Sequence, residues 1–192
     1  MTKWLARRRG LDEKVYSPAE DSALLAETAL SQIDDSPTVL DLGTGSGYIA
    51  SKIQSSSDAW VIASDINPHA CRTVARLGID CIRANLLEPF QDNSIDIVVF
   101  NPPYLPTDPE SSWDDWMERA LDGGPTGRSV IDPFIDTVGR VLSPGGFVLL
   151  LISSLTGFDH IIDHCTRVGF SVVALRDESY PFETLTVLKL IP

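Results

Sequence analysis

Residues 38–47 read TVLDLGTGSG, and this stretch decides the fold. A short apolar run, 38–42, leads into glycines at positions 43, 45 and 47, and a helical pattern follows at once. The apolar run predicts a buried strand, while glycine permits a tight turn and a close approach of the backbone to a ligand. A strand, a glycine-rich turn and a helix in succession are typical of doubly wound α/β sheets, which bind ligands at the carboxyl ends of their strands.

On both sides of this stretch, helical and strand patterns alternate. Helices are expected over residues 19–32, 49–53, 68–77, 130–142 and 158–168, and strands over 38–42, 59–64, 80–83, 95–100, 146–152, 170–175 and 184–190. Alternation of this kind predicts a mostly parallel sheet with right-handed crossovers and helices on both faces. Only residues 176–183 separate the last two strands, which are therefore expected to pair antiparallel. We expect a doubly wound, seven-stranded, mostly parallel sheet with a terminal antiparallel strand.

Length and charge narrow the functional class. The 192 residues predict one domain, 1–192, with an N-terminal arm at 1–17. The 27 acidic residues outnumber the 15 basic ones, and the only basic cluster is Arg7–Arg9. A nucleic-acid-binding protein usually carries a basic stripe, so nucleic acid is not expected as a direct substrate. With 19 Asp but only 4 Lys, the acid excess favours adaptation to high salt, although ordinary acidic solubility explains it too.

Other sequence features argue for a cytoplasmic protein without a metal site. No run of 18 apolar residues and no apolar segment of the signal-peptide type is present. The three cysteines, Cys71, Cys81 and Cys165, form no CxxC pair, which favours structural thiols in a reducing compartment. His160 and His164 are four residues apart, but no third ligand lies in register with them, so no metal is expected.

Asp65 ends the predicted second strand, about 20 residues after the glycine-rich turn. An acid at this spacing commonly binds a ribose diol, and its alternative role is to cap the helix that starts at Pro68. The turn itself has the spacing GxGxG, which differs from the GxGxxG of dinucleotide binders. Asp41 precedes the turn and suits a ligand with an ammonium group better than a phosphate.

The most specific motif is Asn101-Pro102-Pro103-Tyr104, directly after the apolar strand IDIVVF. Two consecutive prolines fix the backbone and remove two N–H donors. The side-chain oxygen of Asn101 and the carbonyl of Pro102 remain as acceptors for both hydrogens of a planar NH2 group, and Tyr104 can lie flat against that group. A rigid turn that only ends the strand is the alternative. The following segment, 101–129, is proline- and glycine-rich and shows little periodicity, which favours a functional loop.

These motifs, in this order, resemble class I S-adenosylmethionine-dependent methyltransferases that modify amide or amino nitrogens. The resemblance is most specific to the HemK family of glutamine methyltransferases, which act on translation release factors, and to its short archaeal and eukaryotic branch. It covers nearly the whole chain, through VYSPAEDS (15–22), DLGTGSG (41–47), SDINP (64–68), NPPY (101–104), GGPTGR (123–128) and ETLTVLKL (183–190).

The resemblance implies a role for each motif. The implied cofactor-binding residues are Asp21, Ser22, Asp41, Gly43, Gly45, Gly47, Asp65, Ile66, Asn85, Leu86 and Asn101, and the implied catalytic residues are Asn101, Pro102 and Tyr104. Asp41 and Gly43 would line the methionine end of the cofactor, and Ile66 would lie against the adenine. Many relatives have Asp where this chain has Asn85, but an amide oxygen can still accept from the adenine amino group.

The implied reaction is N5-methylation of the glutamine in the Gly-Gly-Gln (GGQ) motif of a release factor, with the 101–129 loop near the substrate. Two alternatives use similar motifs: methylation of adenine N6 in nucleic acid, and methylation of a protein lysine. The branch also implies a heterodimer with a small zinc-binding activator. The edge strand around Cys81–Ile82 is expected to receive it, because edge strands are templates for strand addition.

Overall fold

The fold is built on one sheet, which positions every motif described above. The computed structural model describes residues 14–107 and 115–192, and within them the sheet has seven strands. The strands are β1 (Thr38–Leu42), β2 (Trp60–Asp65), β3 (Asp80–Arg83), β4 (Ile95–Phe100), β5 (Leu142–Ser153), β6 (Ser171–Ser179) and β7 (Thr184–Ile191). Most of the N-terminal arm, including Arg7–Arg9, lies outside the described residues, as does the middle of the 101–129 loop.

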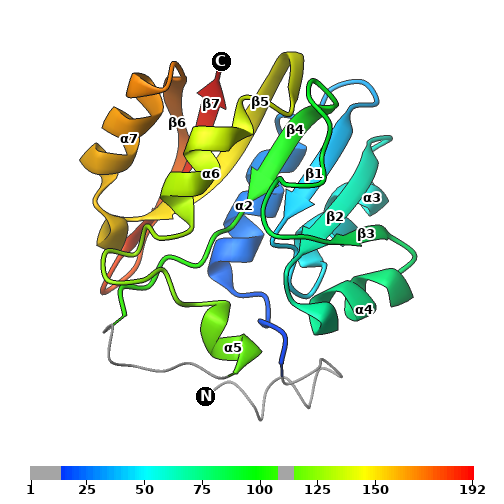
Figure 1. The fold of residues 1–192 in the computed structure, drawn as a ribbon, viewed down its shortest axis with the longest axis horizontal. Helices are drawn as coiled ribbons and strands as arrows, with labels where there is room; N and C mark the ends of the chain where they lie inside the picture. Colours follow the sequence, from blue (N-terminus) through cyan, green and yellow to red (C-terminus); the bar gives the residue numbers. More distant parts are fainter. Residues whose placement is uncertain (1–13, 108–114) are drawn as a thin grey trace.

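The strand order is β3-β2-β1-β4-β5-β7-β6 (Figure 1). The five strands from β3 to β5 are parallel to their neighbours, while β7 runs antiparallel to both β5 and β6. The predicted architecture is therefore confirmed, including the antiparallel pairing of the last two strands. The antiparallel strand is the last in sequence, but it lies one place inside the edge, which β6 forms. As expected, β3 forms the other edge.

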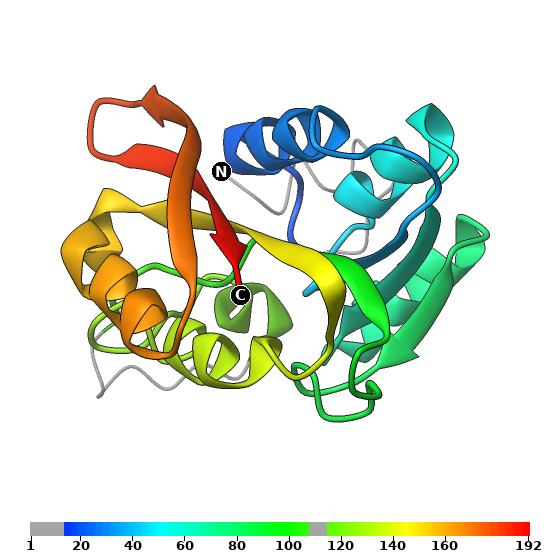
Figure 2. The ribbon, with the colours of Figure 1, turned by 90° about the horizontal axis from the view of Figure 1, so that it is seen from above.

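Helices cover both faces of the sheet. One face packs against α2 (Glu20–Leu30), α3 (Tyr48–Ser56) and α4 (Pro68–Arg76), and the other against α6 (Ile131–Val138) and α7 (Phe158–Arg167) (Figure 2). Each face of the sheet has its own hydrophobic core, and alternate residues of the central strands point into one core or the other. Val39 packs with α2 and α3, while Leu40 packs with α6. Because both faces are covered, these strands are almost continuously apolar rather than alternating.

Several elements differ from the prediction. The helix expected over 130–142 ends at Val138, because Leu142 already pairs with Ile95 at the start of β5. β5 therefore begins four residues before the expected strand, and its pairing with β4 shifts register between Ile95 and Ile97. β6 continues to Ser179, four residues beyond the expected end, because its ladder with β7 runs on through polar residues. A short helix, α5 (Trp116–Arg119), was not expected in the loop.

The strand order places a topological switch point between β1 and β4. From β1 the chain proceeds outward to β2 and β3, and then returns to the other side of β1 as β4 and β5. Leu42 and Phe100 are paired in register at the carboxyl ends of these two strands, so Gly43 and Asn101 follow them side by side. This is the position at which doubly wound sheets bind ligands. Within residues 14–107 and 115–192, no helix is long and apolar enough to cross a membrane.

Candidate active site

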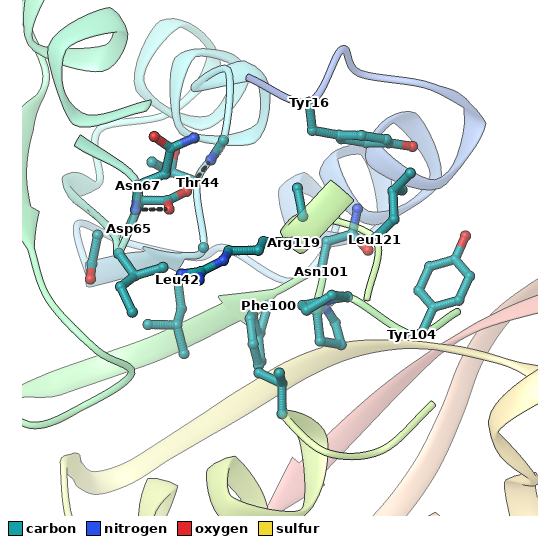
Figure 3. A pocket seen from close by; sticks show the side chains of 18 of the residues that line it. Tyr16, Leu42, Thr44, Asp65, Asn67, Phe100, Asn101, Tyr104, Arg119 and Leu121 are labelled. Carbon is teal, nitrogen blue, oxygen red and sulfur yellow. Dashed lines mark hydrogen bonds between the residues drawn. The ribbon is translucent and has the colours of Figure 1, made fainter. Parts of the chain in front are cut away.

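A cavity of about 460 Å³ opens at the carboxyl ends of β1, β2 and β4. Its volume lies in the range of small-molecule sites, roughly 300–1,000 Å³. Figure 3 shows Thr44 and Asp65 on one side of the cavity and Asn101 and Tyr104 on the other. The lining comes from Tyr16, Asp21, Ser22 and residues 42–46, 48–49, 64–67, 84–86, 100–105, 116, 119–121, 129–130 and 133.

The glycine-rich turn is held from beneath by a buried carboxylate. Asp41, only 1% exposed, accepts hydrogen bonds from Thr44 Oγ1 at 2.6 Å and from the Ala50 backbone N–H at 3.0 Å. It therefore joins the turn to the first turn of α3. Burial raises the pKa of Asp41 to about 7, and the hydrogen bonds from Thr44 and Ala50 oppose that increase.

Asp65 occupies the end of β2 beside the same turn. One carboxylate oxygen accepts from the Gly45 N–H at 2.9 Å, and the other accepts from the Asn67 N–H at 2.8 Å. Burial raises the pKa of Asp65, although these backbone bonds oppose the shift. A carboxylate offers about four lone-pair positions, so Asp65 retains acceptor capacity toward the cavity. Acceptor capacity on a rigid carboxylate suits the hydroxyl groups of a ligand.

A flatter wall adjoins Asp65. Ile66, 50% exposed at the cavity, and Leu86 present apolar surface, and Asn85 lies next to them. The Asn85 side-chain N–H donates to Glu88 Oε1 at 2.8 Å, so its amide oxygen is the atom that remains available. Leu86 has a φ of 47°, a left-handed conformation that is uncommon for a non-glycine residue and is concentrated at functional sites.

On the opposite side, Asn101 is tied to a segment 80 residues earlier in the chain. Its side-chain N–H donates to Asp21 Oδ2 at 3.0 Å, and the Tyr16 hydroxyl donates to the same oxygen at 3.1 Å. The side-chain oxygen of Asn101 is buried and has no hydrogen-bond partner among residues 14–107 and 115–192. A buried unpaired acceptor costs about 1–3 kcal/mol, so this oxygen marks a place where a ligand donor is missing.

Tyr104 is held against the site by a glycine turn. Gly127 has a φ of 73°, and a Cβ atom built on it would lie 2.5 Å from the Tyr104 carbonyl oxygen. Arg128 donates to the Thr156 carbonyl at 2.6 Å and anchors the end of this turn. Gly123, Gly124, Gly127 and Arg128 support the wall behind Tyr104 without lining the cavity. Burial raises the pKa of Tyr104, so its phenol is neutral at ordinary pH.

The structure brings most of the predicted site residues together. Those that line the cavity are Asp21, Ser22, Gly43, Gly45, Asp65, Ile66, Asn85, Leu86, Asn101, Pro102 and Tyr104. Asp41 and Gly47 do not line it, and a direct contact of either residue with a cofactor stays a prediction. Asp41 points into the turn, and a Cβ on Gly47 would lie 2.9 Å from Val74 on α4. These two residues stabilise the conformation of the glycine-rich turn, and other residues of that turn line the cavity.

Several lining residues were not predicted. Trp116 and Arg119 come from α5. In the view of Figure 3, the Arg119 side chain lies between the pair Thr44 and Asp65 and the pair Asn101 and Tyr104. Nothing in the irregular loop sequence signalled that helix. Tyr16 belongs to the quoted VYSPAEDS motif, and its spacing of five from Asp21 was the available signal. His164 lies between Asp132 and Asp136 and does not line the cavity.

Comparison with known proteins assigns the family. Residues 15–113 match the methyltransferase small domain family. A Methanocaldococcus jannaschii protein, provisionally named as a protein N5-glutamine methyltransferase, is 34% identical over 93% of this chain and 92% of its own length. Human methyltransferase HEMK2 is 30% identical over 94% of this chain and 91% of its own length.

A solved structure agrees with these relatives. A chain of the E. cuniculi Mtq2–Trm112 complex, described as responsible for methylation of the termination factor eRF1, matches with a TM-score of 0.77. The two chains are 29% identical, and the match covers 92% of this chain and 98% of that one. Family match, near full-length similarity and shared fold together show that this chain belongs to the HemK-like class I methyltransferases.

Proposed function

We propose that this protein is an S-adenosylmethionine-dependent methyltransferase that modifies the side-chain amide of the GGQ glutamine in a translation release factor. The observation that carries the substrate assignment is the unpaired, buried oxygen of Asn101 beside the rigid Pro102-Pro103 backbone. The names of the relatives, which refer to protein glutamine methylation and to eRF1, point to the same substrate class. We place the reaction in the cytoplasm, where translation terminates.

The residues of the glycine-rich side fit the cofactor. Asp65 retains acceptor capacity for the ribose hydroxyls, and Ile66 and Leu86 offer apolar surface to the adenine. The amide oxygen of Asn85 can accept from the adenine amino group, because Glu88 takes up an N–H on the other side. Gly43 and Gly45 leave room for the methionine part above the turn. When bound, S-adenosylmethionine supplies an electrophilic methyl group.

The Asn101 side supplies orientation rather than acid–base chemistry. An amide nitrogen is a weak nucleophile, because its lone pair is delocalised into the carbonyl. If the Asn101 oxygen and the Pro102 carbonyl accept its two hydrogens, they turn the lone pair toward the methyl group. They also stabilise the positive charge that develops on nitrogen, an effect typically worth a few kcal/mol per hydrogen bond. The nitrogen then releases a proton to solvent.

No strong base is required or evident among the described lining residues. Burial raises the pKa values of Tyr16 and Tyr104, so both phenols stay protonated. None of the three histidines lines the cavity. This absence suits an amide substrate, because its proton becomes acidic only after the nitrogen has been alkylated.

Mass spectrometry would test the substrate directly. The purified protein, alone and with its activator, is incubated with labelled cofactor and recombinant release factor, and the modified peptide is identified. Methylation at the GGQ glutamine, absent when that residue is changed to Glu, supports the proposed function. Label on a lysine of the same protein, or on an adenine-containing oligonucleotide offered at moderate salt, would assign one of the alternative activities instead.

A partner of the zinc-binding activator type is the second part of the proposal. The edge strand β3 carries Ile82, 39% exposed, and the neighbouring Leu77 is 52% exposed. An edge strand with unpaired backbone groups and adjacent apolar surface suits strand addition. Co-expression with a Trm112-type protein should give a stable 1:1 complex, which replacement of Ile82 by Pro should prevent. A chain that is monomeric and fully active alone would exclude an obligatory activator.

A further inference from the structure

The carboxylate of Asp21 is the most heavily hydrogen-bonded acid at the cavity. It is 5% exposed and accepts from Tyr16 and Asn101 through Oδ2, and from the Ser22 backbone N–H and hydroxyl through Oδ1. The distances are 3.1, 3.0, 2.6 and 3.1 Å, respectively. Asp21 thus connects three segments by hydrogen bonds: the loop before α2 through Tyr16, the start of α2 through Ser22, and the end of β4 through Asn101.

This arrangement fixes the orientation of the Asn101 amide. An Asn side chain can present either its oxygen or its NH2 group in a given direction, and the surrounding hydrogen bonds decide which. A carboxylate only accepts hydrogen bonds, so the NH2 group of Asn101 must face Asp21. The amide oxygen of Asn101 is therefore forced to the other side, where it is buried and unpaired. Without Asp21 the amide could rotate and offer donors to a substrate that needs acceptors.

The same carboxylate is saturated. Four donors occupy the roughly four lone-pair positions that a carboxylate offers. Asp21 can therefore hold a substrate ammonium group only by giving up one of these hydrogen bonds. Asp65, which accepts from the Gly45 and Asn67 backbone N–H groups, lies on the other, glycine-rich side of the cavity.

We propose that Asp21 is a positioning residue that orients Asn101 and thereby restricts the site to neutral, planar NH2 groups rather than ammonium groups. The inference rests on the proposed function and deepens it, since it assigns Asp21 to the substrate side rather than to cofactor binding. A protonated lysine offers three tetrahedral donors and a net charge. The oriented site offers the neutral side-chain oxygen of Asn101, and the carboxylate beside it, Asp21, already accepts four hydrogen bonds.

The test compares Asp21→Ala and Asp21→Asn with the control Asp58→Ala, which removes an exposed carboxylate that does not line the cavity. With a GGQ peptide, Asp21→Ala should lower kcat about 100-fold, the order expected for a misplacement of about 1 Å at a reacting group. Asp21→Asn should recover part of that loss, because its amide oxygen can still accept from Asn101. Asp58→Ala should change kcat less than about 3-fold, and the cofactor Kd measured by calorimetry should stay within about 3-fold in all three.

Two further readouts separate orientation from a merely structural role. The Asn101 side-chain NH2 resonances, assigned by their absence in Asn101→Ala, should shift in Asp21→Ala but not in Asp58→Ala. This measurement needs no substrate, so it stands even if GGQ methylation is not found. With a peptide in which Gln is replaced by Lys, the wild-type protein should react at least about 100-fold more slowly than with Gln below the lysine pKa.

Specific outcomes would overturn the assignment. An unchanged kcat and unchanged Asn101 resonances in Asp21→Ala would show that the carboxylate does not orient the amide. A rise in cofactor Kd without loss of kcat would show that Asp21 contributes to cofactor binding rather than to substrate orientation. Equal rates with Gln and Lys peptides would refute the restriction to neutral groups, while the absence of any GGQ methylation would refute the proposed function alone. Melting curves of both Asp21 variants identify a variant that does not fold, and the other variant then carries the test.

Discussion

The two sides of the cavity are assembled in different ways. The glycine-rich side comes from one continuous stretch, 41–67, in which Asp65 and the turn are joined by a hydrogen bond across 20 residues. The Asn101 side joins Tyr16 and Asp21 to a residue 80 positions later, and adds α5 and the Gly127 turn. A local unit can be read from sequence because its spacing is visible, whereas a site assembled from distant segments depends on the strand order. The division also suggests separate tasks, cofactor binding on one side and substrate orientation on the other.

The largest expected effect is on the Asn101 side. Asn101→Ala removes the oriented acceptor and should lower kcat about 100- to 1,000-fold, the magnitude typical of one preorganised hydrogen-bonding group. Cofactor binding should survive in weakened form, because the contacts of Asp65 and the glycine-rich turn remain. Single-turnover methyl transfer and calorimetry measure the two quantities separately. Turnover comparable to that of the unmodified protein would show that the Asn101 side does not orient the substrate.

The reciprocal change is on the glycine-rich side. Asp65→Ala removes acceptors that suit the ribose hydroxyls and releases the Gly45 and Asn67 N–H groups, and it should raise the cofactor Kd about 100-fold, or about 3 kcal/mol. At saturating cofactor, kcat should change little. Calorimetry gives the Kd, and Asp58→Ala, which removes an exposed carboxylate, is the matched control. An Asp65 variant that binds cofactor normally but turns over slowly would reverse the assignment of the two sides.

A smaller effect probes the support behind Tyr104. Gly127→Ala combines a left-handed φ with a clash against the Tyr104 carbonyl and should destabilise the protein by about 2–5 kcal/mol. Gly145→Ala has a similar positive φ of 86° but meets nothing within 4 Å, so it should cost only about 1–2 kcal/mol. Denaturant unfolding of both variants isolates the steric part as their difference. Equal destabilisation would mean that the turn does not press on Tyr104.

The last prediction concerns stability rather than turnover, and it is a pH dependence on the glycine-rich side. Burial raises the pKa of Asp41 from 3.8 to about 7, so between these values the folded protein holds a proton that the unfolded chain releases. The contribution of Asp41 to the free energy of unfolding therefore falls as the pH rises through this window and is constant above it. Asp41→Asn should lack this fall. The free energy of unfolding of the variant, minus that of the unmodified protein, should therefore increase as the pH rises from about 4 to about 7.

Unfolding at pH 5 and pH 8 measures the difference. The raised pKa of Asp65 acts in the same direction, but it is present in both proteins and so cancels in the comparison. Asp58→Asn, which removes an exposed charge, controls for the loss of one carboxylate. A constant difference between Asp41→Asn and the unmodified protein across this range would show that the buried carboxylate is ionised throughout.

Local motifs allowed much of the fold and site to be predicted. The strands β1, β2, β3 and β4 begin and end within one residue of the expected positions, because apolar runs bounded by Gly, Pro and Asp have clear limits. The end of β6 could not be predicted in this way. Its side chains are exposed on an edge strand, so no burial pattern marks its limits, and only pairing with β7 decides its length.

The sequence by itself determined the family, the doubly wound sheet and the residues that carry the chemistry, because these depend on short spacings such as DLGTGSG and NPPY. Only the tertiary structure decided which of those residues reach the cavity. In the folded protein, the Asp41 side chain points into the glycine-rich turn, and α5 contributes to the cavity lining. The Asp21 carboxylate accepts a hydrogen bond from Asn101. Hydrogen-bond saturation is the physical reason for the last result. Whether a carboxylate can still accept from a ligand depends on all the donors around it, and those donors come from segments that only folding brings together.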